Sequence, residues 1–574
     1  MQIKLVKNIV ERFYANKRYK LYLITLASLF ASLFEYCGLA LIFQFIIVLT
    51  NPNSLQANFI ITFFKNYFNI SNFSTIGLLL GVCIALIYIF KNIYLFIFTI
   101  IQSKVFQDLS VEMTLKITND ILFGNYIKVS SIPGDKKLGM FSKINIVVWG
   151  YISQFINLIN NFTIIIILLL FLFIKFTAPA IVAFCFIAVL SSIEYLILKS
   201  KSNYQKKYFG LRFDDLNKLI LRIVNATKEI KINNKAGLFL LKAKEKYTAI
   251  ADLNKKSAIN GVFHIHFTEI SVMSTFIIIL CVLYCTTDFN NQTIILALGT
   301  IIAVILRITP AVNRFQSSMY GINSNENIAK ELIQFDKELD NIEETYETCE
   351  KLPFEKEISL NNVFFKYPDS QFGLENINLN IKKGEFIGIV GHSGCYKTTL
   401  SLILAGLINA DSGEILVDGN VIKDNDFKKW QNNIAILSQD FSLIIDNTFD
   451  NLNREIIEKL ELKNFNKNPL LLSYGQKQRV ALAQTIAQNK ELLILDEATS
   501  SLDVLSEDKI NEILLNLKGE KTIVSIAHRL QILKHCDRII YMDKGKIIDI
   551  DTFLNLNNKY EEFKKIVELS NFKL

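Results

Sequence analysis

Hydrophobic residues gather into six long runs within the first 320 residues of this 574-residue chain. Each run offers about the 20 apolar residues that a helix needs to cross the hydrocarbon core of a bilayer. The pattern therefore predicts an all-α transmembrane domain over residues 1–320 with six spanning helices. Their predicted ranges are roughly 21–50, 75–104, 152–175, 178–198, 260–286 and 292–315.

The connections between these runs alternate in their content of Lys and Arg. Both residues are abundant before the first run and in the connections near 105–150 and 199–259, and they are scarce in the others. Because cytoplasmic connections carry the excess of Lys and Arg, both termini are predicted to be cytoplasmic. Apolar residues at helical spacing in the two long connections favour helices that continue beyond the bilayer. The aromatic segment 54–68, on the outer side, is either an interfacial helix or an extension or loop after the first span.

Composition divides the chain into two parts. Overall, 51% of the residues are hydrophobic and only 20% are charged. Residues 353–574 contain 27 Lys or Arg and 31 Asp or Glu, a net charge of −4, whereas the first 352 residues carry a net charge of +12. This contrast predicts a membrane domain, a linker at 321–352 and a soluble domain at 353–574. The same contrast argues against a single globular enzyme.

A few ionisable residues interrupt the predicted spans. Charge buried in lipid is costly, so each such side chain must face a cavity, a partner or the headgroups. Lys91 and Arg307 have apolar residues on both sides, which makes them candidates for lining a substrate path. The alternative for Arg307 is an ion pair with an acid such as Glu35 or Glu269.

The soluble part contains a strand, loop and helix pattern that is typical of phosphate binding. An apolar strand at 384–390 leads into the loop, and a leucine-rich helical segment follows it. Backbone N–H groups of such a loop, at a helix N-terminus, receive phosphates. Lys397 would reach the β- and γ-phosphates of a nucleotide, and the Thr398 hydroxyl would bind Mg²⁺. The loop residues are Gly391, His392, Ser393, Gly394, Cys395, Tyr396, Lys397, Thr398 and Thr399.

Two further apolar strands end in residues that suit nucleotide chemistry. The run at 492–497 ends in Asp496, which can hold Mg²⁺, and Glu497, which can polarise a water molecule. His528 follows another apolar strand at 522–527. An α/β nucleotide-binding domain with a phosphate-binding loop is therefore predicted for residues 353–574.

These motifs, in this order, resemble those of the ATP-binding cassette (ABC) transporters. The resemblance is to exporter half-transporters, with six spans followed by one nucleotide domain, and it extends over essentially the whole chain. It implies that Tyr367 stacks on adenine and that Gln439 lies near Mg²⁺ and the coupling interface. It also implies that Glu497 is the catalytic base and His528 the switch histidine. ATP and Mg²⁺ are the implied cofactors.

The resemblance also implies a dimer. Ser473, Gly475 and Gln476 resemble the signature motif, which acts on ATP held by the opposite protomer, and Asp503 resembles the D-loop residue. Because one chain has one nucleotide domain, a second half-transporter is required, and a homodimer is the simplest choice.

The implied function is ATP-driven export or flipping of an amphipathic substrate across the bacterial inner membrane. Within the family, the outer aromatic segment and Arg307 in the last span resemble the bacterial lipid-linked oligosaccharide flippases. Peptide, lipid and drug-like cargo are alternatives. No DNA-binding motif or basic helix indicates a nucleic-acid partner.

Three departures from the family pattern leave another alternative open. Tyr396 and Tyr474 stand where glycines are usual, and the stretch from Gln439 to Leu472 is short for an exporter. Glycine gives backbone freedom and close approach to phosphate, which a tyrosine reduces. The chain is therefore also compatible with a weakly hydrolysing regulatory half of a heterodimer.

Overall fold

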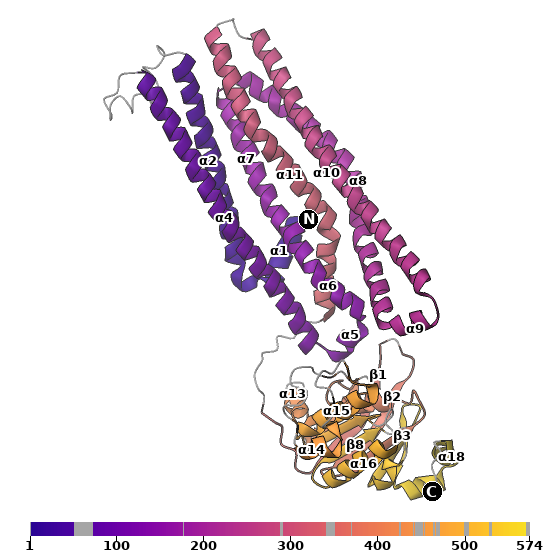
Figure 1. The fold of residues 1–574 in the computed structure, drawn as a ribbon. Helices are drawn as coiled ribbons and strands as arrows, with labels where there is room; N and C mark the ends of the chain where they lie inside the picture. The colour runs from indigo at the N-terminus through magenta and orange to yellow at the C-terminus, as the bar shows by residue number, and fades with distance from the viewer. Residues whose placement is uncertain are drawn as a thin grey trace. The chain divides into compact units, whose positions relative to one another are not determined.

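The chain folds into two compact units, Met1–Glu343 and Glu344–Leu574, which are described separately. The structure is a computed structural model (Figure 1). It describes residues 2–50, 73–175, 177–286, 291–339, 350–368, 370–423, 426–439, 441, 443, 452, 454–462, 465, 471–498, 504–526 and 531–569.

The described residues of the first unit form helices, of which six are long (Figure 1). A helix of about 50 residues is about 75 Å long, more than twice the thickness of a hydrocarbon core. The prediction that helices continue beyond the bilayer is therefore confirmed. The long helices are α2 (Arg18–Thr50), α4 (Phe73–Phe123), α7 (Ser153–Lys175), α8 (Thr177–Asn225), α10 (Ala236–Thr286) and α11 (Asn291–Leu339). The short elements are α1 (Gln2–Phe13), η1 (Ala15–Lys17), α5 (Tyr126–Ser131), α6 (Gly134–Val147), η3 (Val148–Ile152) and α9 (Thr227–Ile232).

Five helical stretches among the described residues are long and apolar enough to cross a membrane. They are Ala15–Val48, Thr75–Phe123, Gly134–Ile174, Ala236–Cys281 and Leu298–Leu339. These stretches contain or overlap five of the six predicted spans. The remaining prediction, 178–198, lies within α8, and many of its side chains are outside the described residues. The aromatic segment 54–68 is also outside them.

Residues 321–339, which were predicted to begin a linker, instead form the end of α11. Ile322, Leu332 and Leu339 on this part of the helix are buried in a core cluster with residues of α1, α4 and η3. Apolar residues at helical spacing continue past the last span and pack against these neighbours. The helix therefore continues where the change in composition had indicated a connection.

A buried ion network joins three helices of the first unit. Asp336 on α11 is fully buried, and it pairs with Arg12 on α1 and with Lys116 on α4, the latter at 3.3 Å. A carboxylate with two cationic partners is tolerated in such a place, whereas an unpaired one would be strongly destabilising. The network therefore fixes α1 against the ends of α4 and α11.

The second unit contains an antiparallel sheet of four strands. In the sheet the strands follow the order β2 (Gly373–Lys382), β1 (Glu357–Lys366), β4 (Ser412–Val417) and β5 (Asn420–Val421). Buried and exposed residues largely alternate along β2, as expected for a strand with one face on the core.

The other sheet of this unit has six strands and is parallel except at one edge. Its order is β10 (Lys546–Asp551), β9 (Arg538–Asp543), β3 (Phe386–Gly391), β8 (Thr522–Ile526), β7 (Leu492–Asp496) and β6 (Ile434–Leu437), with β10 antiparallel. Every residue of β7 and β8 is buried, which explains their continuous apolar runs. The helices are α12 (Lys397–Leu404), α13 (Phe427–Gln431), α14 (Arg454–Lys459), α15 (Tyr474–Ala487), α16 (Val504–Leu517), α17 (Phe553–Lys559) and α18 (Glu561–Leu569).

Asp418 forms hydrogen bonds with the backbone at the start of β1, and its replacement should destabilise the second unit. Its carboxylate accepts three backbone N–H bonds, from Glu355, Lys356 and Glu357, at 2.7, 2.7 and 2.9 Å. Burial alone would raise the pKa of Asp418, but these donors hold the pKa below its usual value. We expect Asp418→Asn to lower the free energy of unfolding by about 1–2 kcal/mol at pH 7, measured by chemical unfolding of the full chain.

The pH dependence tests the same contact. Because the folded pKa is depressed, the stabilisation is present above the unfolded pKa of about 3.9 and is lost as pH falls through the folded pKa. The difference between parent and variant should therefore shrink below about pH 4. Asp411→Asn is the control with a smaller expected loss, since Asp411 accepts one N–H bond, from Lys366. A constant difference down to pH 3 would contradict the assignment.

Candidate nucleotide site

The residues with phosphate chemistry follow strands of one parallel sheet. The loop that begins at Gly391 follows β3, Gln439 follows β6, and Asp496 is the last residue of β7. The strands β3, β8, β7 and β6 are parallel neighbours in this order. Their carboxyl ends therefore meet at one edge of the sheet, where open α/β sheets bind ligands.

Two glycines of the phosphate loop are required by geometry. A Cβ atom on Gly391 would lie 2.2 Å from the carbonyl oxygen of Met542, so a larger residue does not fit. Gly394 has a φ of +82°, in the left-handed region that favours glycine. The loop then enters α12, whose first N–H groups have no helical partner and are directed at this edge.

Lys397 lies inside the loop rather than in solvent. Its side chain is buried, and its ammonium donates hydrogen bonds to the carbonyl oxygens of Gly391 at 2.8 Å and His392 at 3.1 Å. His392 and Ser393 are exposed on the outside of the loop. The ammonium also lies 3.9 Å from the Cys395 sulfur, and a charged donor held by such neutral acceptors can exchange them for the stronger acceptor oxygens of a phosphate.

Thr398 and Asp496 are brought into direct contact. The Thr398 hydroxyl donates to Oδ2 of Asp496 at 2.7 Å, although the two residues lie 98 positions apart in sequence. A hydroxyl and one carboxylate, completed by phosphate oxygens and water, form the ligand set that Mg²⁺ takes in nucleotide sites. Among the residues that the structure describes, no group of three or more His, Cys, Asp or Glu side chains could hold a metal ion. Thr398 and Asp496 are the protein groups that could hold Mg²⁺ beside a bound nucleotide.

Glu497 occupies a sharp turn at the end of β7. Its φ is +54°, and its Oε2 accepts a hydrogen bond from Nε2 of Gln439 at 3.1 Å. Its carbonyl oxygen accepts another from Nε2 of Gln478 on α15 at 3.0 Å. One side-chain amide therefore holds the carboxylate of Glu497, and another holds its backbone in the turn. The sequence did not indicate the contribution of Gln478.

The residues of the predicted signature motif begin α15. Ser473 is the N-cap, and its hydroxyl accepts from the Gln476 N–H at 3.3 Å, while Oε1 of Gln476 accepts from the Ser473 N–H at 2.9 Å. This capping box fixes the first turn, in which Gly475 follows Tyr474. The Tyr474 ring is exposed and packs near Phe441 at a centroid distance of 5.6 Å. The exposed first turn leaves this helix end available to a ligand or a partner.

Tyr396 adopts the backbone conformation that a glycine usually supplies. Its φ is +73° and its ψ is +26°, a left-handed conformation that costs a non-glycine residue about 1–2 kcal/mol. Its hydroxyl donates to the carbonyl oxygen of Phe372 at 2.9 Å and lies 3.2 Å from the Ser370 hydroxyl. The side chain therefore joins the phosphate loop to the segment that follows Tyr367.

Tyr367 itself lies beside the phosphate loop. Its hydroxyl is 3.4 Å from the Thr399 hydroxyl, and its ring packs edge-on against Phe365 at a centroid distance of 4.9 Å. The predicted adenine-stacking residue and the predicted phosphate-binding residues are thus neighbours in space. The contact between Tyr396 and Phe372 could not be found from sequence, because no pattern reports the direction of that side chain.

Comparison with known proteins agrees with this geometry. Residues 374–500 match the ABC transporter family. The C-terminal unit contains an ABC transporter domain. Over 333 residues the chain is 31% identical to "ABC transporter C family member 13" of Dictyostelium discoideum, covering 52% of this chain and 25% of that protein. Over 238 residues it is 33% identical to a Staphylococcus aureus protein whose name includes "multidrug export ATP-binding/permease protein", covering 37% of this chain and 41% of that protein.

The fold of the whole chain is that of an ABC exporter. It superposes on the "Structure of a bacterial Atm1-family ABC exporter with ATP bound" with a TM-score of 0.75 at 15% sequence identity, over 98% of this chain and 99% of the other. The predicted fold class, a helical membrane domain followed by an α/β nucleotide domain, is confirmed. The sequence alignments cover less than half the length of the two curated relatives named above.

Two predicted residues of the ABC transporter domain cannot be placed. His528 and Asp503 lie outside the described residues. The strand that precedes His528, β8, ends at Ile526 between β3 and β7. Their roles therefore stay predictions.

In the first unit, Lys91 and Arg307 lie close together, and their place on a substrate path stays a prediction. Both pair with Glu35, Arg307 at 3.7 Å, and the guanidinium of Arg307 lies 4.5 Å from the centroid of the Tyr88 ring. The alternative of an ion pair between Arg307 and Glu35 is thus what the structure contains. Two cations share this one carboxylate, which the sequence did not indicate.

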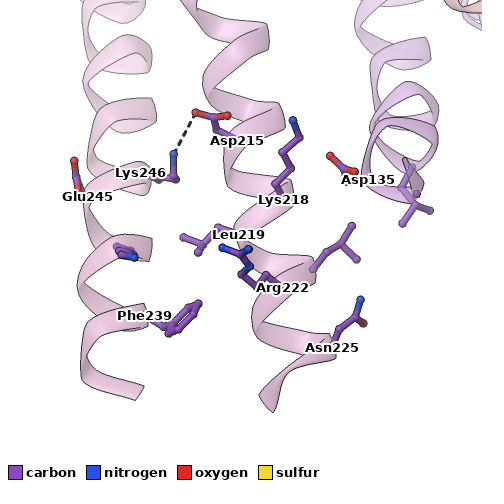
Figure 2. A pocket seen from close by; sticks show the side chains of 13 residues that line it. Asp135, Asp215, Lys218, Leu219, Arg222, Asn225, Phe239, Glu245 and Lys246 are labelled. Carbon is purple, nitrogen blue, oxygen red and sulfur yellow. Dashed lines mark hydrogen bonds and ion pairs between the residues drawn. The ribbon is translucent and has the colours of Figure 1, made fainter. Parts of the chain in front are cut away.

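A cavity of 890 Å³ lies among the helices α6, α8 and α10 of this unit (Figure 2). Lys246 of α10 pairs with Asp215 of α8 across it at 3.2 Å. Figure 2 shows Arg222 on α8 and Phe239 on α10 further along the two helices. The cavity lies in the predicted cytoplasmic connections and outside the nucleotide site.

Cys395 gives a test of the loop geometry. The thiol is almost fully buried, and burial raises its pKa although Lys397 acts in the opposite direction. Because the thiolate is the nucleophile, we expect N-ethylmaleimide to modify Cys395 at least about tenfold more slowly in the folded chain than in the unfolded chain at pH 7. The rate of modification of Cys395 in the folded chain should still rise with pH above about 8.5, where an ordinary thiol is already half ionised. Mass spectrometry of the peptide measures both rates, and equal rates at pH 7 would contradict the described loop.

Proposed function

We propose that the chain is a half-transporter that hydrolyses ATP to move an amphipathic substrate across a bacterial inner membrane. One observation carries the proposal: the pairs Thr398–Asp496 and Gln439–Glu497 meet at the edge that receives the phosphate loop, in a chain that also contains apolar helices long enough to span a membrane. Phosphoryl transfer depends mainly on positioning and charge stabilisation, which this arrangement supplies.

Each residue then has a defined part in nucleotide binding. Tyr367 stacks on adenine, the N–H groups between Gly391 and Thr399 hold the phosphates, and Lys397 contacts the β- and γ-phosphates. Thr398, Gln439 and Asp496 would hold Mg²⁺, which neutralises charge on the phosphates when it is bound. The remaining members of the binding loop are His392, Ser393, Gly394, Cys395 and Tyr396.

Hydrolysis requires a base and a switch. Glu497 orients the attacking water or accepts its proton, and the hydrogen bond from Gln439 fixes the direction of the carboxylate. His528 contacts the γ-phosphate when the site is closed. Gln439 is the residue that we expect to couple the state of the site to the membrane helices, as the resemblance to exporters implies.

A second copy of the chain completes each site. Ser473, Gly475, Gln476 and Asp503 act on ATP held by the opposite protomer, where the N-terminus of α15 adds positive dipole charge. ATP binding then closes the two nucleotide domains and draws the long cytoplasmic helices together, and hydrolysis reverses this. Both termini lie in the cytoplasm in this arrangement.

The proposed cargo is a lipid-linked oligosaccharide. Lys91 and Arg307 share the single charge of Glu35, which leaves one positive charge in excess within apolar helices. Such a charge is costly in lipid and suits an anionic headgroup such as a pyrophosphate. Peptide, lipid and drug-like molecules are the other cargo to be tested, and the name of one relative includes "multidrug export".

Glu497→Gln should abolish turnover while leaving ATP binding intact. Loss of a general base lowers kcat by about 10²–10⁴-fold, and the amide keeps the shape of the side chain. Phosphate release by the full chain in lipid measures kcat, and a fluorescent ATP analogue measures binding. The matched control is Glu491→Gln, since Glu491 precedes the same strand and pairs with Lys383 at 3.5 Å. Unchanged turnover in Glu497→Gln would disprove the assignment.

The conformation of Tyr396 supports a second candidate, the regulatory half of a heterodimer. Replacing a strained left-handed residue by glycine relieves about 1 kcal/mol, so Tyr396→Gly should raise ATP turnover about fivefold. Tyr396→Phe, which keeps the ring and loses the bond to Phe372, separates strain from the hydroxyl contact. Turnover only in Tyr396→Gly would favour the heterodimer. Turnover in Tyr396→Gly at or below the parent level would show that Tyr396 does not slow the site.

A further inference from the structure

The first unit contains a second cavity, of 640 Å³, whose wall on α7 is made of amide side chains. Gln154, Asn157, Asn160 and Asn161 line it at spacings that place them along one face of the helix. Asn161 is almost fully buried and donates to the carbonyl oxygen of Asn157 at 2.7 Å. Four amides in the first turns of an apolar helix are unusual, because each must find hydrogen-bond partners.

One of these amides has an unused acceptor. Oδ1 of Asn160 is covered from solvent and has no hydrogen-bond partner among the described residues. Leaving a buried acceptor unsatisfied costs about 1–3 kcal/mol. A ligand hydroxyl in the cavity would remove that cost.

The wall on α11 adds a cation. Asn313, Arg314 and Ser317 line the cavity, and within the described part of the chain no acidic side chain pairs with Arg314. Arg314 lies seven residues, about 10 Å, beyond Arg307 along the helix, so it is separate from the Glu35 pair. An unpaired guanidinium beside several amides suits an anionic group on a polar molecule.

The wall on α10 is apolar and open. Ala258, Gly261, Val262 and Ile265 follow one another at helical spacing on the side facing the cavity. A Cβ atom on Gly261 would meet nothing within 4 Å. This side therefore offers room and an apolar surface opposite the amides.

The predicted orientation places this cavity at the cytoplasmic boundary of the membrane. Its α7 residues begin the third predicted span, and its α11 residues end the sixth. A polar cavity at this level, with one apolar wall, matches a molecule whose headgroup is in water and whose chain is in lipid.

We propose that this cavity binds the headgroup of the transported substrate before transport, and that the headgroup is rich in hydroxyls and carries an anionic group. The proposal rests on the proposed function. Amide side chains donate and accept hydrogen bonds, as sugar hydroxyls do, so Asn157 and Asn160 form hydrogen bonds with the hydroxyls of the headgroup. Arg314 holds the anionic group, and the α10 wall takes the first part of the lipid chain.

Filling the cavity tests the site without removing a hydrogen bond. Gly261→Leu places a side chain in open space, and Gly237→Leu is the matched control, because Gly237 is on the same helix, outside the cavity, and also has nothing within 4 Å of a Cβ atom. The full chain in proteoliposomes is given polyprenyl-pyrophosphate oligosaccharide, and the half-saturating concentration for stimulated ATP hydrolysis is measured. We expect an increase of at least about tenfold for Gly261→Leu, as loss of about 1.4 kcal/mol of binding gives, and no change for Gly237→Leu.

Two polar variants separate the parts of the headgroup. Arg314→Gln should weaken both the glycosylated probe and polyprenyl pyrophosphate without sugar by about tenfold. Asn160→Leu should weaken only the glycosylated probe, by about fivefold. Vesicles of phosphatidylglycerol and phosphatidylethanolamine without either probe show whether an ordinary phospholipid headgroup fills the cavity. These vesicles alone could stimulate ATP hydrolysis, and Arg314→Gln and Asn160→Leu could weaken that stimulation equally. This result would show that the cavity binds a phospholipid headgroup instead of a glycan, and it would overturn the proposal.

The outcomes also separate this proposal from the proposed function. If the parent hydrolyses ATP and responds to the glycosylated probe, but Gly261→Leu responds at the same concentration, the cavity does not bind the headgroup. If the parent does not hydrolyse ATP although Tyr396→Gly does, the proposed self-sufficient transporter fails instead. In that case native mass spectrometry measures binding of the glycosylated probe to the parent and to Gly261→Leu, which tests the cavity proposal by itself. Weaker binding to Gly261→Leu supports the proposal, and equal binding overturns it.

Discussion

The parallel pairing of β3, β8, β7 and β6 is the constraint on which the nucleotide site depends. Parallel strands end at one edge, so residues that are 98 positions apart in sequence come within hydrogen-bond distance, as Thr398 and Asp496 do. The strands can be parallel only because helices and loops return the chain after each one, and because both faces of the sheet are covered. A loss of register in β7 would therefore move both Asp496 and Glu497 away from the phosphate loop.

In the membrane unit the comparable constraint is the burial of acids. Glu35 and Asp336 each pair with two cations, and each pair set includes one cation from α4. Both sets also join α11, at positions 29 residues apart, about 43 Å along the helix. Ion pairs thus connect helices α4 and α11 at two positions along their length. Apolar side chains pack between these two positions. Removing either acid would leave two cations unpaired in an apolar environment.

The phosphate loop shows how one residue connects parts of a site. Tyr396 bears the cost of a left-handed conformation, and its hydroxyl reaches the segment after Tyr367. The phosphate loop and the segment after Tyr367, the predicted adenine-stacking residue, are therefore joined by the Tyr396 side chain, where a glycine is usual. Tyr396 therefore strains the loop through its backbone and stabilises it through its hydroxyl. Its effect on nucleotide binding depends on the balance between the cost of the left-handed conformation and the gain from the hydrogen bond.

The sequence alone determined the order of the domains and the chemistry of the loop. Apolar runs of membrane length, continuous apolar strands and the Gly391–Thr399 pattern are local features, and local features can be read without the fold. The capping box of Ser473 and Gln476 was not predicted, although it too joins residues only three positions apart.

Only the tertiary structure decided which residues meet. The pairing of Glu35 with both Lys91 and Arg307, the direction of the Tyr396 side chain and the amide-lined cavity all involve elements distant in the chain. The end of α11 was misread for the same reason, because its apolar face has meaning only against α1 and α4. Periodicity reports which face of a helix is apolar, but the partner of that face is set by packing of the whole unit.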